Sequence, residues 1–496
     1  MLAEGVPADG RAILFIGGHW VPPSGGAYRP VTDPSTGQRI GEVAVGNRDD
    51  ARAAVDAAAA MEDRWGTTPG HERSRILRTI SERLRNDREN MARLIAREVG
   101  KPIREAGVEV ERASGVFLLA AEEIRHLTGE SYPADAYTYP PGNEERFLFS
   151  VRDPIGVVVA IAPFNFPLNL LTHKVAPALA AGNPVVAKPT SAAPFTALRL
   201  AQHAEAAGVP AGALNLVLGT GDEVGGTLVE HPRTRLVTFT GSTSIGKGIA
   251  ERAGRHAKRV ILEMGGMDPF LVLEDAPMKV AVEAAVRGAF GYSGQVCTAS
   301  KRLLVADSVA DGFGHALAER AARLKVGPAI EPATEVGPLI DPPAVARMTE
   351  FVADAKDRGA EILTGGERPP GLGQGNFFLP TVLDRVTPES RVAREEPFGP
   401  VAPILRFSDD ESALRIANGT PYGLQAAIYT NDLSRAFRLA KRIRAGGVHV
   451  NDPTNLRWDA LPFGGVKDSG LGREGLRYAM QEMTEVKLIS INYRAP

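Results

Sequence analysis

The chain has 496 residues, more than one hydrophobic core normally supports, so we expect two or three domains. A hydrophobic content of 44% and a charged content of 23% are average for a soluble globular enzyme. The formal net charge of −2 gives no basic surface, which argues against nucleic acid as a partner.

The chain begins with MLAEGVPADGRAILFIGG, which has no basic segment followed by a long apolar stretch, so no signal peptide is expected. No run approaches the roughly eighteen apolar residues of a membrane helix. The one cysteine excludes an intrachain disulfide and fits a reducing compartment. These features predict a cytoplasmic protein without a membrane partner.

Residues 47–130 have the periodicity of helices. Apolar residues between Ile76 and Val99 recur at helical spacing, and Gly100 follows as a stop. The next segment, SYPADAYTYPPGNEERFLFSVRDP, mixes Pro and Gly with alternating side chains, which predicts a hairpin arm. The tail TEVKLISINY is its expected partner strand.

After the arm, short β-rich runs that end in Gly, Pro, Ser or Thr alternate with helical stretches. A second series of this kind follows Glu263 and continues to about residue 450. Continuous apolar strands that alternate with helices predict an α/β fold with parallel sheets covered on both faces.

Two strand ends carry polar side chains that suit a ligand. Asn165, in APFNFP, could donate its amide to a developing oxyanion or could satisfy the local turn. Lys188 ends the apolar run NPVVAK, where α/β folds bind ligands, and could contact ribose or phosphate or only solvent.

Two glycine-rich turns follow. LGTGDEVGG has the spacing G-x-G-x-x-x-G, which is weak evidence for a dinucleotide site. FTGSTSIGKG leads from a strand over Leu236–Thr240 into a helix that begins near Ser244. The N-terminus of this helix suits a pyrophosphate, and the alternative is a Gly-Ser turn that only caps the helix. This segment also matches most of a P-loop, but Gly248 stands where a hydroxyl would bind Mg²⁺, so we disfavour an NTPase.

Glu263 and Cys297 are the strongest candidates for chemistry. Glu263 ends a fully apolar strand, where a carboxylate is costly unless it is paired, protonated or catalytic. A lone cysteine is usually an inert buried residue, but one near a base is a candidate nucleophile. The two residues are 34 positions apart and can meet only through the fold.

Seven segments in chain order, over nearly the whole length, resemble the NAD(P)-dependent aldehyde dehydrogenase superfamily. They read PFNFP, KP, FTGST, LEMGG, GQVC, EEPFGPV and PFGGVKDSGLGRE. The resemblance implies a Rossmann-like dinucleotide-binding domain over 1–128 and 149–262 and an α/β catalytic domain over 263–467. It also implies a β-hairpin oligomerisation arm over 129–148 and 468–496, and assembly into a homodimer or homotetramer.

The resemblance also implies roles for individual residues. Cys297 matches the nucleophile that forms a thiohemiacetal and then a thioester, and Asn165 matches its oxyanion donor. Glu263 matches the base that activates water to release a carboxylic acid, and Lys174 and Glu474 match a relay for its proton. No metal is expected.

Further positions match the sites of NAD or NADP and of the aldehyde. The cofactor positions are Lys188, Ser191, Gly221, Phe239, Gly241, Ser242, Ile245, Glu396 and Phe398. The substrate positions are Phe166, Val296, Thr298, Arg457 and Phe463.

Two positions bear on specificity. Ser191 stands where many NAD-preferring members carry an acid that repels a 2′-phosphate, so both NAD and NADP are permitted. Arg457 stands where an apolar pocket residue is common and could bind an anionic or hydroxylated aldehyde, or could only pair with Asp459.

The sequence therefore predicts NAD(P)-dependent oxidation of a small polar or anionic aldehyde, such as a semialdehyde, a phosphorylated or phosphono-aldehyde, or a hydroxyaldehyde. A CoA-acylating enzyme is an alternative that Glu263 argues against, because acylating relatives generally lack this base. A non-catalytic binding or structural protein of the same fold is the alternative from another class, and Cys297, Asn165 and Glu263 argue against it.

Overall fold

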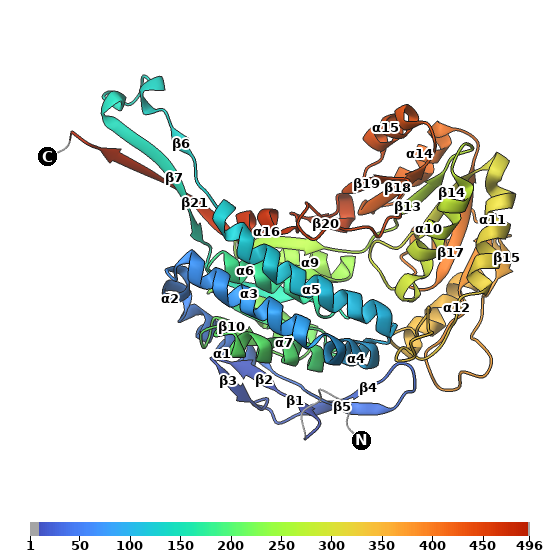
Figure 1. Cartoon of the computed structure of the whole chain (residues 1–496), viewed down its shortest axis with the longest axis horizontal. Helices are drawn as coiled ribbons and strands as arrows, with labels where there is room; N and C mark the ends of the chain where they lie inside the picture. Colours follow the sequence, from blue (N-terminus) through green and yellow to red (C-terminus); the bar gives the residue numbers. More distant parts are fainter. Residues whose placement is uncertain (1–8, 495–496) are drawn as a thin grey trace.

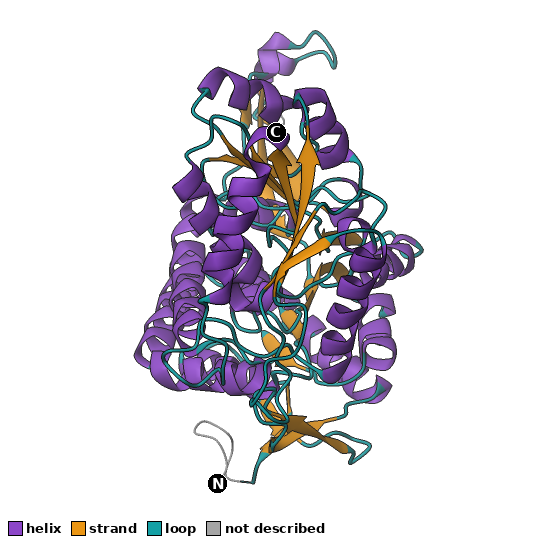
Figure 2. Ribbon diagram, turned by 90° about the vertical axis from the view of Figure 1, so that its right-hand side faces the viewer, coloured by secondary structure: helices purple, strands orange, loops and turns teal. Residues whose placement is uncertain are grey.

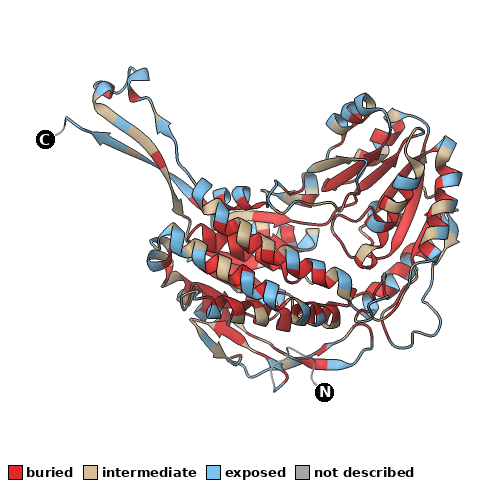
Figure 3. Ribbon diagram, viewed as in Figure 1, coloured by how far each residue is buried: buried red, intermediate tan, exposed pale blue. Residues whose placement is uncertain are grey.

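Two large sheets and a projecting arm organise residues 9–494, which the computed structural model describes (Figure 1). Helices cover both faces of each large sheet (Figures 1 and 2). Buried residues concentrate in the sheets and on the helix faces turned toward them, while the arm is mainly half-buried or exposed (Figure 3). No helix within residues 9–494 is long and apolar enough to cross a membrane.

The first large sheet has eight strands, and its five central strands are parallel. Continuous Val, Ile and Leu runs form these central strands because both of their faces are buried. In spatial order the strands are β20 (Gly470–Leu471), β12 (Arg259–Glu263), β11 (Thr234–Thr240), β8 (Val157–Ile161), β9 (Val185–Lys188), β10 (Leu214–Leu216), β2 (Leu14–Ile16) and β3 (His19–Val21).

Helices on both faces complete the core of this sheet. One face packs on α6 (Asn169–Ala180) and α7 (Pro194–Ala206), behind which lie α3 (Gly70–Asn86), α4 (Arg88–Val99) and α5 (Ile103–Glu123). The other face packs on α1 (Arg48–Ala59), α8 (Gly226–Glu230) and α9 (Thr243–Gly254). The helical character predicted for residues 47–130 is confirmed as far as residue 126, whereas residues 127–130 are not helical, and Gly100 ends α4 in the left-handed conformation at φ 71°.

The second large sheet has seven strands, all parallel except β15 at one edge. In order they are β15 (Glu361–Thr364), β16 (Thr381–Asp384), β17 (Val401–Phe407), β14 (Arg302–Ala306), β13 (Pro269–Val272), β18 (Gln425–Tyr429) and β19 (Gly447–Val450). Its helices are α10 (Met278–Phe290), α11 (Asp307–Ala322), α12 (Pro342–Asp357), α13 (Arg391–Arg394), α14 (Asp410–Asn418) and α15 (Leu433–Arg442).

Two small sheets complete the fold. Near the N-terminus β4 (Tyr28–Thr32) and β5 (Arg39–Ala44) form a hairpin, and β1 (Arg11–Ala12) pairs with β5. In the arm, β7 (Arg146–Pro154) pairs antiparallel with β21 (Thr484–Asn492) and with β6 (Ser131–Tyr132). The predicted hairpin arm and the tail as its partner strand are therefore confirmed.

Two predicted boundaries differ from the strands that are present. β7 begins at Arg146 and crosses the boundary expected at residue 149, because its pairing with β21 is continuous from Arg146 to Pro154. β20 pairs with β12 opposite Glu263, so residues 470–471 belong to the first large sheet and not to the arm. The division into three functional domains otherwise stays a prediction.

Candidate active site

A cleft of about 870 Å³ opens at the carboxyl ends of the parallel strands β8, β9 and β11. Ligands of open α/β sheets bind at this edge, because loops that follow the strands converge there. All nine positions predicted for the cofactor line this cleft, as do Asn165 and Cys297. Most of these residues follow strands of the first sheet, whereas Cys297, Glu396 and Phe398 come from the segment that forms the second sheet.

One wall of the cleft is the turn from β11 into α9. Ser242 is the N-cap of α9, so the free N–H groups of the first helical turn point toward the cleft, where they suit a pyrophosphate. A side chain at Gly241 would place its Cβ 2.5 Å from the Phe239 ring, so only glycine fits beside that ring. Lys247 pairs with Asp468 at 2.7 Å, which further weakens the P-loop alternative.

A second wall carries Lys188 at the end of β9 and Ser191 three residues later. Burial lowers the pKa of the Lys188 ammonium to about 8, and the positive charge of Arg29 acts in the same direction. The Ser191 hydroxyl is 3.4 Å from the Gly219 carbonyl, so this wall is cationic and offers a hydroxyl where an acid would repel phosphate.

Cys297 follows a backbone segment in an unusual conformation. Tyr292, Ser293 and Gly294 have φ values of 44°, 56° and 69°, a left-handed run that is costly for the two residues with side chains. The Tyr292 hydroxyl donates to the Val99 carbonyl at 2.9 Å, and the Ser293 hydroxyl donates to the Gly337 carbonyl at 2.8 Å. These contacts hold the turn that presents Cys297 to the cleft.

Two further side chains that line the cleft are the Cys297 thiol and the Asn165 amide. Burial raises the pKa of the half-buried Cys297 thiol to about 12, Lys301 opposes this, and the Glu263 carboxylate adds to it. Asn165 is 2% exposed, and its side-chain oxygen has no hydrogen-bond partner among the described residues. A buried amide of this kind is available to a ligand.

Glu263 is buried at the end of β12, and neither of its carboxylate oxygens has a hydrogen-bond partner within residues 9–494. Burial raises the pKa of Glu263 well above its usual range, and the negative charge of Glu474 acts in the same direction. A carboxyl group with a raised pKa holds a proton more tightly than an ordinary glutamate, which suits a general base.

Lys174 and Glu474 form a buried ion pair next to this carboxyl group. Lys174 Nζ lies 2.7 Å from Glu474 Oε1, and Arg457 Nη2 lies 3.0 Å from Glu474 Oε2. Burial raises the pKa of Glu474, but the charges of Lys174 and Arg457 outweigh it and bring that pKa down to about 2. Glu474 is therefore an anion, and Glu263 is the carboxyl group that can change its protonation state.

Arg457 belongs to an ion network that the sequence did not reveal. Besides Glu474, Arg457 lies 3.9 Å from Asp459 and donates to His173 Nδ1 at 3.3 Å, while its guanidinium carbon lies 3.8 Å from the centre of the Phe463 ring. Its Nε is buried without a partner among the described residues. The predicted pairing with Asp459 is thus the weaker of two ion pairs.

The other members of this network are His173, Asp459 and Arg112. His173 Nε2 is 2.9 Å from Asp459 Oδ1, and Arg112 binds both oxygens of Asp459. Burial and the charge of Arg457 lower the pKa of His173 to about 4, so its imidazole is neutral. His173 and Asp459 are 286 positions apart in the chain, and Arg112 and Asp459 are 347 positions apart, so a single sequence gives no signal for these contacts.

The predicted substrate positions do not line the cofactor cleft. Val296 and Thr298 are buried on either side of Cys297, and Phe463 lies against Arg457. The Phe166 ring is held by the buried Lys101, whose Nζ is 3.5 Å from the ring centre. Their contact with substrate stays a prediction.

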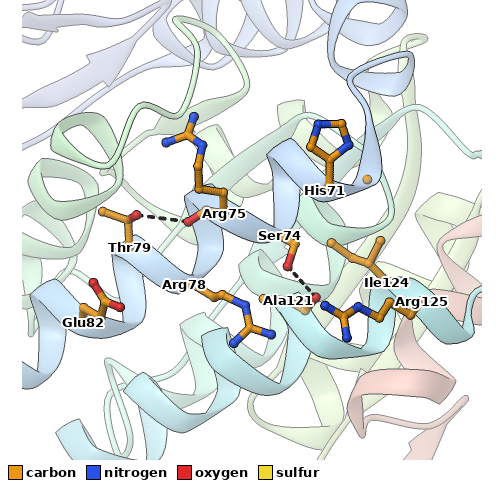
Figure 4. A pocket seen from close by; sticks show the side chains of 10 residues that line it. His71, Ser74, Arg75, Arg78, Thr79, Glu82, Ala121, Ile124 and Arg125 are labelled. Carbon is orange, nitrogen blue, oxygen red and sulfur yellow. Dashed lines mark hydrogen bonds between the residues drawn. The ribbon is translucent and has the colours of Figure 1, made fainter.

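A second hollow, of about 520 Å³, lies over α3 and α5 (Figure 4). Its lining includes His71, Arg75, Arg78 and Arg125, and the Ser74 hydroxyl donates to the Ala121 carbonyl at 2.9 Å (Figure 4). None of the predicted site residues lines this hollow, so it is not the catalytic cleft.

The residues that line the cleft suit a dinucleotide bound next to a cysteine. Helical N–H groups, a strand-end lysine and a carboxylate at Glu396 line one cleft and provide partners for phosphates and ribose hydroxyls. Cys297 and Asn165 line the same cleft. A model of the aldehyde dehydrogenase family matches residues 20–489.

The chain belongs to this family. It is therefore an oxidoreductase that oxidises an aldehyde with NAD or NADP, and the predicted family and fold class are confirmed.

Curated relatives of this aldehyde dehydrogenase match along nearly their whole length. A glutarate-semialdehyde dehydrogenase from Pseudomonas putida is 40% identical over 97% of this chain and 98% of its own. A succinate-semialdehyde dehydrogenase [NADP(+)] from Escherichia coli is 40% identical with the same two coverages. A lactaldehyde dehydrogenase from Methanocaldococcus jannaschii is 39% identical over 97% of this chain and 100% of its own.

A solved structure supports the same assignment. A betaine aldehyde dehydrogenase from Staphylococcus aureus in complex with NAD+ superposes with a TM-score of 0.95. It is 32% identical, and the alignment covers 100% of this chain and 97% of that chain.

Proposed function

We propose that this aldehyde dehydrogenase oxidises a small polar or anionic aldehyde to the carboxylic acid through a thioester on Cys297. The observation that carries the proposal is the single cleft in which Cys297 and Asn165 meet all nine predicted cofactor positions. Glu263, a carboxyl group without a hydrogen-bond partner among the described residues, is the candidate base for hydrolysis.

In the first half-reaction the Cys297 thiol gives its proton to solvent and its sulfur attacks the aldehyde carbon, which gives a thiohemiacetal with its oxygen as an oxyanion. Asn165 and the Cys297 N–H donate to the oxyanion that forms. The bound nicotinamide supplies the hydride acceptor, and the carbon on sulfur is left as a thioester. In the second half-reaction Glu263 takes a proton from water as the water attacks the thioester, and Cys297 is released with the acid.

The proton that Glu263 takes up must leave before the next turnover. The Lys174–Glu474 pair, whose charges act on Glu263, is our candidate for the relay. Lys174 also donates to Thr238 at 3.3 Å, so its ammonium is held in place on β11. Lys174 and Glu474 thus act as positioning and relay groups in this proposal, while Glu263 reacts.

The substrate class is supported by the relatives and by Arg457. Those relatives carry the names of glutarate-semialdehyde, succinate-semialdehyde and lactaldehyde dehydrogenases, which denote aldehydes with a carboxylate or a hydroxyl. The unpartnered Nε of Arg457 is a donor that such a group could use. Nη2, which a bidentate contact would need, already binds Glu474 and His173, so we propose a single hydrogen bond from Nε rather than a bidentate clamp.

A panel of aldehydes tests both the activity and this role of Arg457. Each aldehyde is offered with NAD+ and with NADP+, and reduced cofactor is followed by absorbance. We expect Arg457→Leu to lower kcat/KM by about tenfold or more for anionic aldehydes, the size of one charge-assisted hydrogen bond. The loss for neutral aldehydes should be smaller, and Arg457→Lys should restore part of the difference.

Two results of the panel would overturn the proposal. If the wild-type enzyme turned over no aldehyde, the dehydrogenase assignment for this chain would fail. If Arg457→Leu lowered kcat/KM equally for anionic and neutral aldehydes, Arg457 would have no part in recognition and would act only through Glu474. Obligatory CoA would identify the acylating alternative instead.

Cofactor choice is open to a separate test at Ser191. We propose that both NAD+ and NADP+ are accepted, because Lys188 and Arg29 make this wall cationic and Ser191 carries no charge. Ser191→Glu should lower kcat/KM for NADP+ by about 10- to 100-fold through repulsion of the 2′-phosphate, with little change for NAD+. Ser191→Gln is the neutral control of similar size, and an equal loss with Ser191→Gln would contradict the electrostatic explanation.

We also propose that the arm is the surface through which copies associate. Exposed apolar side chains follow β7 and β21, among them Phe147, Val486, Leu488 and Ile491. Val486 and Leu488 lie on one face of this sheet and Ile491 and Phe147 on the other, and exposed apolar side chains on a projecting sheet favour burial in an oligomer. The particle mass from light scattering distinguishes a dimer from a tetramer, and the cytoplasmic location stays a prediction.

A further inference from the structure

Lys301, four residues after Cys297, is a buried cation that the predicted roles leave unused. Its side chain is 2% exposed, which is a costly place for an ammonium group without partners. Nζ lies 3.0 Å from Glu396 Oε1 and donates a short hydrogen bond to the Cys297 carbonyl. One side chain thus contacts both the segment that carries the nucleophile and the carboxylate predicted to bind a ribose.

Glu396 is held from two sides by these contacts. Its Oε1 forms the ion pair with Lys301 and accepts a hydrogen bond from the N–H of Gly266 at 3.2 Å. Its Oε2 lies over Gly265, where an added Cβ would come within 2.4 Å of that oxygen. Glu396 lines the cleft, so with Oε1 engaged we assign Oε2 as the acceptor for ribose hydroxyls.

The same ammonium group acts on the sulfur of Cys297. Burial and three carboxyl groups (Glu263, Asp268 and Glu396) raise the pKa of the Cys297 thiol, and Lys301 is the group that lowers it. Lys301 also acts on two of those carboxyl groups: its charge lowers the pKa of Asp268, and it forms an ion pair with Glu396. Removal of Lys301 would therefore remove the positive charge that lowers the pKa of the Cys297 thiol.

We propose that Lys301 is a positioning residue that couples cofactor binding to the reactivity of the nucleophile, by fixing Glu396 and the Cys297 backbone with one charge. The inference rests on the proposed function of Glu396 and Cys297. It assigns to Lys301 two measurable effects: it holds the ribose-binding carboxylate in position, and it favours the thiolate form of Cys297 over the thiol.

The test uses Lys301→Met, Lys301→Arg, Glu396→Gln and the double variant Lys301→Met/Glu396→Gln. Cofactor binding is measured as the Kd of NAD+ and of NADP+ by calorimetry, without substrate. Thiol reactivity is measured as the rate of Cys297 alkylation by iodoacetamide at pH 8, without cofactor. Neither measurement needs turnover, so a failure of the proposed function in the aldehyde panel is distinguishable from a failure of this inference.

We expect Lys301→Met to weaken cofactor binding about tenfold, since coupling between sites is typically 5- to 150-fold. Alkylation should slow by about three- to tenfold, because the thiolate fraction falls as the thiol pKa rises. Lys301→Arg should restore most of both losses, because it keeps the charge. Lys247→Met, which removes an exposed lysine paired with Asp468, is the matched control and should leave alkylation unchanged.

The double variant separates coupling from general damage. If Lys301 acts on cofactor through Glu396, Lys301→Met should add little to the loss caused by Glu396→Gln, and alkylation should return toward the wild-type rate because both charges are gone. Additive losses of cofactor binding, or unchanged alkylation in Lys301→Met, would overturn the inference. If Lys301→Met does not fold, Glu396→Gln alone must speed alkylation, and an unchanged rate would again overturn it.

Discussion

Cys297→Ser is expected to lower kcat by at least about 10⁴-fold, the largest effect of any single substitution in this aldehyde dehydrogenase. A serine hydroxyl is a far weaker nucleophile than a thiolate. Within residues 9–494 the one side chain hydrogen-bonded to residue 297 is Lys301, which contacts the backbone carbonyl and not the reacting side chain. The thioester cannot form, so mass spectrometry after incubation with aldehyde and cofactor should show unmodified protein.

The control for this variant is cofactor binding. Cys297 is one of many residues that line the cleft, and Lys188, Gly241 and Ser242 are unchanged in this variant, so the Kd of NAD+ should change by no more than about twofold. Turnover above about 1% of the wild-type rate, with no adduct, would show that another group carries out the attack.

Glu263→Gln is expected to produce a burst of about one equivalent of reduced cofactor per site, followed by a steady rate lowered by about 10²- to 10⁴-fold. Glutamine fills the same volume but cannot accept a proton from water, so the thioester on Cys297 accumulates. Stopped-flow absorbance gives the burst, and intact mass gives an adduct of one acyl group. A lowered steady rate without a burst would place Glu263 in the first half-reaction instead.

The pH dependence of the wild-type enzyme follows from the same group. The pKa of Glu263 is raised, so its base form is depleted, as pH falls, at pH values above those at which an ordinary glutamate becomes protonated. Steady-state kcat should therefore decline on the acid side, and Glu263→Gln should lose this limb of the profile. Added CoA should not rescue Glu263→Gln, whereas an acylating enzyme would regain turnover.

The sequence predicted the parts of the site that follow strand ends. Asn165, Lys188, Gly241 and Glu263 each come at or just after the carboxyl end of a parallel strand, so a sheet-edge rule brings them together. The hairpin arm and its tail strand were also predictable, because alternation and turn residues are local signals.

The ion network around Arg457 was not predictable in this way. The sequence offered Asp459 as a partner because it is two residues away, but the segment from Phe463 to Glu474 folds back and brings Glu474 closer. Lys301 was missed for a related reason: a lysine four residues after Cys297 resembles a surface residue until the second sheet buries it. Long-range pairing depends on chain paths that local patterns do not specify.

The left-handed turn before Cys297 has a consequence for inherited variation. Its conformation, costing about 1–3 kcal/mol at each of Tyr292 and Ser293, persists only because the carbonyls of Val99 and Gly337 accept their hydroxyls. Damaging alleles should therefore concentrate at the end of α4 and near residue 337, as well as around Cys297.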